Sequence, residues 1–177
     1  MRFVVSGEMN RNRLLQLIVI LFLVYVALLW VTNAVLFFQK MSLNPQSVVE
    51  YYLGSEERFL QPRSFQGMVE VSHFHLFAMG LLLMTLTHLM LFVPLSWNTK
   101  ALFVIVPFFA ALLDEGSGWL VRFVSPHFAI LKITGFLLLE ASLAALTIAS
   151  LWAIFGGSSQ AYSGIDDDED DEDDEDD

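Results

Sequence analysis

Long apolar runs dominate the pattern of hydrophobic and polar positions along the chain. Four of them, at residues 14–38, 72–93, 99–122 and 126–155, contain few charged side chains. An α-helix rises about 1.5 Å per residue, so about 20 residues are needed to cross roughly 30 Å of hydrocarbon. The pattern therefore predicts four transmembrane helices and argues against the alternative of a soluble all-α protein.

Capping signals and connection lengths predict where these helices begin and how they pack. Ser125 followed by Pro126 is typical of a helix start, and Ser64 is a suitable N-cap for an earlier start of the second span. Short connections join the second span to the third and the third to the fourth. We therefore expect these three helices to pack antiparallel to their neighbours in a compact bundle.

The segment between the first two spans has its own helical signal. It contains Asn44-Pro45, an apolar stretch from Val48 to Leu53, and then Gly54. We expect a short interfacial helix here, with Tyr51 and Tyr52 at the level of the lipid headgroups. The predicted fold class is thus an all-α integral membrane four-helix bundle with a short interfacial helix.

The formal net charge of −11 arises from one segment, because residues 166–177 are all Asp or Glu. The nine Lys and Arg residues nearly balance the other eight acidic residues. A block of like charges repels itself and buries no apolar surface. We therefore expect a transmembrane bundle over residues 1–157 and a disordered acidic tail over residues 158–177. The tail is either a docking segment for a basic partner such as a cytochrome c, a weak divalent-cation site, or a solvated terminus.

Orientation in the membrane depends on the first span, because Lys and Arg are equally numerous on the two sides of the predicted bundle. Arg11 and Arg13 directly precede that span. Basic residues that flank the first span usually remain in the cytoplasm. We therefore predict a multi-pass protein with both termini in the cytoplasm.

The chain has no cysteine, which excludes disulfides, thiolate metal sites, iron–sulfur clusters and covalent haem attachment. Any cofactor must therefore be bound by His, carboxylate or Met side chains. An ionisable group inside a span costs at least a few kcal/mol, so each is a candidate for function or for a structural pair. Helical depth places these groups in an outer layer (His73, His75, Asp114, Glu115, Arg122, His127 and Lys132) and an inner layer (His88 and Glu140).

The first interpretation of these layers is a non-covalent b-type haem. His73 or His75 would pair with His127 as axial ligands, and His88 is the remaining candidate. Glu70, one turn before His73, would accept the second ring N–H and orient the imidazole. Histidines near both ends of one transmembrane helix resemble the arrangement in b-type cytochromes. The resemblance implies an electron-transfer role in a respiratory-type complex, with other membrane or cytochrome subunits as partners.

The second interpretation is a copper, zinc or iron site. Its candidate ligands are His73, His75, Asp114, Glu115 and His127, which supply nitrogen and oxygen donors. The two histidines of the H-x-H motif point about 200° apart on a regular helix. A single metal would therefore need an irregular backbone at this point.

The third interpretation is structural, and it makes the protein a non-catalytic scaffold or accessory subunit. Asp114 or Glu115 would pair with Lys132 or Arg122, and Glu140 would meet His88. Gly116-Ser117-Gly118 would then allow a close contact between helices.

Signatures of independent catalysis are absent, including a Walker loop, a dinucleotide fingerprint, G-x-S-x-G and H-E-x-x-H. Nothing in the chain indicates nucleic-acid binding. We therefore expect no independent enzyme activity, and at most a role as an electron-transfer subunit.

Part of the chain resembles small four-helix bacterial inner-membrane proteins of uncharacterised function. The resemblance runs from Ser64 to Phe155 and rests on the H-x-H motif, the Leu-rich span ending in His88-Leu89 and the run from Asp114 to Arg122. The resemblance implies a bacterial inner-membrane location and assigns no catalytic residue.

Overall fold

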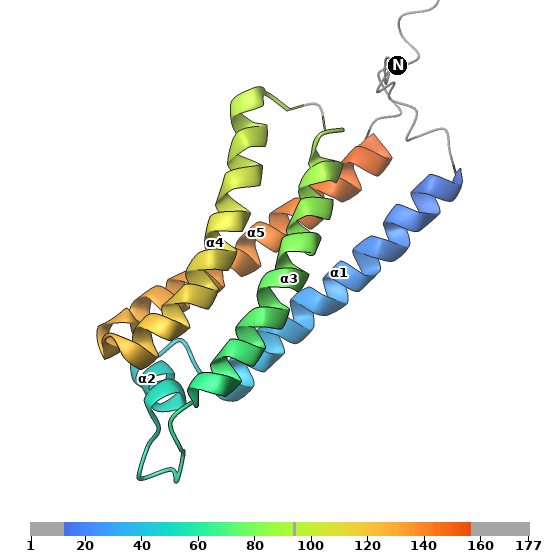
Figure 1. The fold of residues 1–177 in the computed structure, drawn as a ribbon. Coiled ribbons are helices and arrows are strands. Elements are labelled where there is room, and N and C mark those ends of the chain that lie inside the picture. The colour runs from blue at the N-terminus through green and yellow to red at the C-terminus, as the bar shows by residue number, and fades with distance from the viewer. Residues whose placement is uncertain (1–12, 94, 157–177) are drawn as a thin grey trace, which may run out of the picture.

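The computed structural model describes residues 13–93 and 95–156, and this part of the chain is all-helical with no strand. A single isolated bridge joins Ser55 to Leu60. The elements, shown in Figure 1, are α1 (Arg13–Lys40), α2 (Pro45–Leu53), α3 (Phe65–Met90), α4 (Trp97–Phe123), the 3-10 turn η2 (Pro126–Phe128) and α5 (Ala129–Gly156). The predicted all-α class is confirmed, and the predicted acidic tail lies outside the described residues.

Four helices, α1, α3, α4 and the unit formed by η2 and α5, are long and apolar enough to cross a membrane. Their positions agree with the four predicted spans. The second begins at Phe65 rather than Ser72, because the Ser64 hydroxyl accepts the backbone N–H of Gly67 at 3.1 Å and caps the helix there. The Ser125 hydroxyl likewise caps η2, with Pro126 at its first position.

The short helix predicted between the first two spans is confirmed as α2, which begins at Pro45. The Asn44 side chain accepts the backbone N–H of Gln46 at 3.0 Å. Gly54 ends the helix with a φ of 87°, and a Cβ at this position would lie 2.6 Å from the carbonyl oxygen of Leu60. The chain therefore turns back toward α3 through a conformation that glycine adopts without strain.

The bundle is built around the α4–α5 pair. Helix α3 packs against both α4 and α5, whereas α1 packs mainly against α5, and α2 covers one end of α4 and α5 (Figure 1). The end of the bundle that carries α2 has a core of its own, in which the rings of Phe37 from α1 and Phe136 from α5 stack with centroids 3.7 Å apart. At this end the walls of the bundle therefore come from five helices.

Candidate functional site

Two contacts between ionisable side chains lie inside the bundle near α2. In the first, the Lys132 ammonium on α5 donates to Asp114 Oδ1 on α4 at 2.7 Å and to the Asp114 backbone carbonyl at 2.9 Å. Both side chains are buried. The structural interpretation expected Asp114 or Glu115 to pair with Lys132 or Arg122, and the Asp114–Lys132 pair confirms one of those options.

Close approach of α5 to α4 makes this pair possible. A Cβ at Gly135 would lie 2.8 Å from the backbone nitrogen of Asp114. Gly135 therefore lets the two backbones meet, one turn beyond Lys132 on the same helix. The expected close contact at Gly116-Ser117-Gly118 takes a different form, because Gly118 lies against the ring of Tyr52 from α2 and a Cβ at Gly116 would meet nothing within 4 Å.

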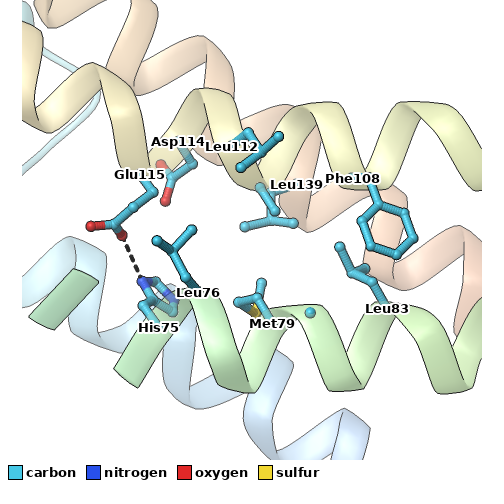
Figure 2. A pocket seen from close by; sticks show the side chains of 11 residues that line it. His75, Leu76, Met79, Leu83, Phe108, Leu112, Asp114, Glu115 and Leu139 are labelled. Atoms are coloured by element: carbon cyan, nitrogen blue, oxygen red, sulfur yellow. Dashed lines mark hydrogen bonds and ion pairs between the residues drawn. The ribbon is translucent and has the colours of Figure 1, made fainter. Parts of the chain in front are cut away.

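The second contact is a hydrogen bond between His75 and Glu115, and it joins α3 to α4. His75 Nδ1 lies 3.0 Å from Glu115 Oε2, as Figure 2 shows. The Ser72 hydroxyl donates to the other oxygen of Glu115 and accepts the indole N–H of Trp119 at 2.8 Å. When Nδ1 carries the proton that Glu115 accepts, the Nε2 atom of a neutral His75 is an acceptor.

The other three histidines, His73, His88 and His127, are exposed on the helical surface. The regular backbone of α3 turns His73 away from His75, as the 200° separation predicts. Among the described residues, no group of three His, Asp or Glu side chains is close enough to hold a metal ion. The candidate ligands are therefore not gathered into one site, and His75 is the histidine that is partly buried.

Two expected pairs have other partners. The Glu140 carboxylate accepts the Asn33 amide N–H at 2.6 Å, and the Glu140 backbone carbonyl accepts the Trp30 indole N–H at 3.0 Å. The partner of this carboxylate is therefore a residue of α1 and not His88. Glu70 accepts the amide of Gln66 at 2.9 Å rather than orienting His73. The expectation for Glu140 was wrong because its partner depends on how α1 packs against α5, which spacing along one helix does not specify. The expectation for Glu70 was wrong because Gln66, four residues earlier on α3, is also within reach of this carboxylate.

A cavity of about 930 Å³ lies among the five helices at the α2 end. The cavity is lined by polar and small residues of α4 and α5 and by two tyrosines of α2: Asp114, Glu115, Gly118, Lys132, Tyr51 and Tyr52. A smaller cavity of about 60 Å³ lies next to it, between α3, α4 and α5 (Figure 2), and His75 lines both. Its remaining walls are mostly apolar, including Met79, Leu83, Phe108 and Leu139.

The larger cavity reaches the surface of the protein between α1 and α3, and also at residues 61–64, whose side chains are exposed. Leu36 of α1 and Val71 and Phe74 of α3 line it, and all three side chains are exposed. Helix α1 leaves this gap because it packs mainly against α5. In a membrane, this opening would face the lipid.

Comparison with known proteins places the chain in a family. Residues 42–161, more than half of the chain, match the model of a transmembrane helical domain family, Aq_1264_TM. The chain belongs to this family. Together with the four spans, this membership makes the chain a multi-pass membrane protein in contact with the lipid bilayer. No curated protein and no solved structure matches the chain.

The family match begins after α1, so the Aq_1264_TM domain includes α2 to α5 and both contacts between ionisable side chains but not the α1 wall of the cavity. Sequence reasoning missed Ser72, Trp119, Asn33 and Tyr52 as parts of this region. Of these four residues, Ser72 could have been predicted from the sequence, because it lies three residues before His75 and therefore on the same face of the helix.

Proposed function

We propose that this membrane protein binds an amphiphilic ligand in the cavity at the α2 end of its bundle. The observation that carries the proposal is the cavity of about 930 Å³, which combines apolar walls with polar groups and opens between two membrane-spanning helices. Ligand sites in proteins are concave and mostly apolar, with a few polar groups that orient the ligand. A molecule with a polar head and an apolar tail matches this combination.

The opening supports a ligand that arrives from the bilayer. Leu36, Val71 and Phe74 present exposed apolar side chains at the edge of the cavity. An apolar tail can pass between them without leaving hydrocarbon, so no charged surface has to be crossed.

Polar groups in the cavity support a ligand with a hydrogen-bonding head. The hydroxyl of Tyr52 makes no hydrogen bond to another described residue, and Nε2 of His75 is likewise without a bond to the described part of the chain. Lys132 and Asp114 satisfy each other and need no ligand. The head of the ligand would therefore meet Tyr52 and His75 rather than the buried ion pair.

Narrowing the opening tests the proposal. The double variant Leu36→Trp/Val71→Trp places larger side chains on both of its edges, and we expect at least about tenfold less bound amphiphile, which corresponds to ~1.4 kcal/mol of binding free energy. Native mass spectrometry of the full chain, released from detergent after purification from membranes, measures the lipid-sized mass that is retained. The matched control is Leu102→Trp/Ile105→Trp on α4, where both side chains are exposed and neither lines the cavity.

Equal retention in the two double variants, or no retained mass in the unsubstituted protein, would contradict the proposal. The second result would favour the scaffold interpretation, in which the buried pairs only hold the bundle together.

A role as a haem-binding subunit of a respiratory-type complex is a second proposal, and one observation favours it. His75 offers a ring nitrogen to both cavities, and an imidazole is an axial ligand in many haem proteins. The reduced minus oxidised absorption spectrum of the purified protein, made in a host that supplies haem, tests this role. We expect an α band that the His75→Ala substitution abolishes. A flat spectrum would exclude a bound haem and would contradict the proposal of cytochrome partners.

A further inference from the structure

Two basic side chains lie at the edge of the larger cavity without a carboxylate partner. Lys40 is the last residue of α1, and Arg63 directly precedes the cap of α3. Within the described residues, the contacts between basic and acidic side chains join Arg58 to Glu50, His75 to Glu115 and Lys132 to Asp114, and neither Lys40 nor Arg63 takes part.

The position of Arg63 is defined by three contacts. Its backbone N–H donates to the Tyr52 carbonyl at 3.0 Å, and its own carbonyl accepts Nε of Arg122 at 2.9 Å. Its guanidinium carbon lies 4.1 Å from the centre of the Tyr51 ring. Stacking on an aromatic ring leaves the N–H groups at the edge of the guanidinium free to bind an anion.

Tyr52 adds a neutral donor beside these charges. Tyr52 is 9% exposed, and its hydroxyl has no hydrogen-bond partner among the described residues. Burial is the main cause that raises the pKa of Tyr52, and the carboxylate of Asp114 acts in the same direction. The hydroxyl therefore keeps its proton at neutral pH and can donate it to an acceptor.

We infer that the ligand of this cavity is a phospholipid whose phosphate lies at Lys40 and Arg63 and whose acyl chains lie between α1 and α3. The inference rests on the proposed amphiphile site and names the class of its ligand. Lysine and arginine are the usual donors to phosphate oxygens, and Arg presents paired N–H groups that match them.

The depth of the two cations favours a lipid. Both lie at ends of membrane-spanning helices, where lipid phosphates are found and where basic residues attract anionic lipids. Three carboxylates also line this cavity: Asp114 pairs with Lys132, Glu115 bonds to His75, and Glu70 accepts from Gln66. Lys40 and Arg63 are therefore the basic side chains of the lining that no carboxylate of the described residues engages. A free phosphate ion would use the same donors but would leave the apolar opening at Leu36 and Val71 unfilled.

The test is a titration of the delipidated full chain in detergent, followed by native mass spectrometry. Dioleoylphosphatidylglycerol and dioleoylglycerol have the same acyl chains, and the second lacks the phosphate. We expect phosphatidylglycerol to bind at least about tenfold more tightly, and Arg63→Gln and Lys40→Gln each to weaken it about fivefold without changing the binding of dioleoylglycerol. Arg58→Gln is the matched control, because Arg58 pairs with Glu50 and does not line this cavity.

Three results would overturn the inference. They are equal binding of the two lipids, unchanged phosphatidylglycerol binding in both cavity-edge variants, and displacement of the lipid by millimolar inorganic phosphate. If Arg63→Gln disturbs the loop, Lys40→Gln decides, since the exposed side chain of Lys40 forms no ion pair or hydrogen bond with another described residue. The two lipids could bind equally to the unsubstituted protein and not at all to the Leu36→Trp/Val71→Trp variant. That result would support the amphiphile site but exclude recognition of the phosphate. Failure of both lipids to bind at all would remove the proposed function itself.

Discussion

At the scale of single residues, buried charge governs the stability of this bundle. Lys132 and Asp114 are both buried, and each satisfies the other through short contacts. A buried pair contributes little net stability compared with well-packed apolar groups, but removal of one partner leaves an uncompensated charge. The pair is therefore sensitive to single substitutions and tolerant of a matched double one.

Lys132→Met should destabilise the protein by about 3–5 kcal/mol, because it leaves Asp114 buried and unpaired. The double variant Lys132→Met/Asp114→Asn should recover most of this loss. Thermal unfolding in detergent measures both effects, with Lys100→Met as the control for loss of a lysine that neither pairs with a carboxylate nor lines the larger cavity. Equal destabilisation in the single and double variants would show that the ion pair does not explain the loss.

The phenol of Tyr52 adds a dependence on pH at the same scale. Burial and the nearby carboxylates of Asp114 and Glu115 raise the pKa of Tyr52, which the charge of Arg63 only partly opposes. A group whose pKa is higher in the folded state stabilises the fold fully below its unfolded pKa of about 10 and loses that contribution as the pH rises through the folded value. Folding stability should therefore fall above about pH 10.

Tyr52→Phe should make this alkaline loss smaller, because phenylalanine has no proton to release. Melting temperatures of the wild type and of Tyr52→Phe between pH 8 and 11 measure the difference, with Tyr51→Phe as the neighbouring control. Parallel curves for wild type and Tyr52→Phe would exclude Tyr52 as the titrating group.

At the scale of elements, one glycine sets the distance between α4 and α5. Gly135 lies against the backbone of Asp114, and a Cβ there would meet two α4 backbone atoms at 2.8 and 2.9 Å. Backbone atoms cannot move aside as a flexible side chain does. The contact therefore fixes both the helix pair and the geometry of the Lys132–Asp114 contact.

Gly135→Ala should destabilise the protein by about 1–3 kcal/mol through forced separation of α4 and α5. Gly80→Ala is the matched control, because a Cβ at Gly80 meets nothing within 4 Å and alanine favours a helix by up to about 1 kcal/mol. Unfolding of the two variants in the same detergent gives the comparison. A Gly135→Ala protein as stable as Gly80→Ala would contradict the close helix contact.

At the scale of the whole molecule, the four spans place α2 and the α4–α5 turn at one end of the bundle. The start of α1, the end of α5 and the α3–α4 connection lie at the other (Figure 1). Ligand access therefore differs between the two membrane surfaces, because the larger cavity belongs to the α2 end.

Single cysteines in this cysteine-free chain test that arrangement. Glu57→Cys and Asn98→Cys are exposed positions at opposite ends, and they should react with a membrane-impermeant maleimide from opposite sides of sealed vesicles. Ala141→Cys, which is exposed in the middle of α5, should stay unlabelled in hydrocarbon. Labelling of Glu57→Cys and Asn98→Cys from the same side would contradict the four-span topology.

The sequence by itself determined the helices and most of their ends. Long apolar runs, Ser64, Ser125-Pro126 and Gly54 are local signals, since helix length and capping depend on residues only a few positions apart. The same reasoning identified Asp114 and Lys132 as candidates for one buried pair.

Only the tertiary structure decided which side chains meet. The rotation and register of each helix relative to its neighbours are set by packing over the entire bundle, so spacing along one helix does not show that Glu115 meets His75 or that Asn33 satisfies Glu140. The larger cavity also results from helix packing. Helix α1 packs mainly against α5 rather than against α3, and the cavity lies where α1 and α3 are separated.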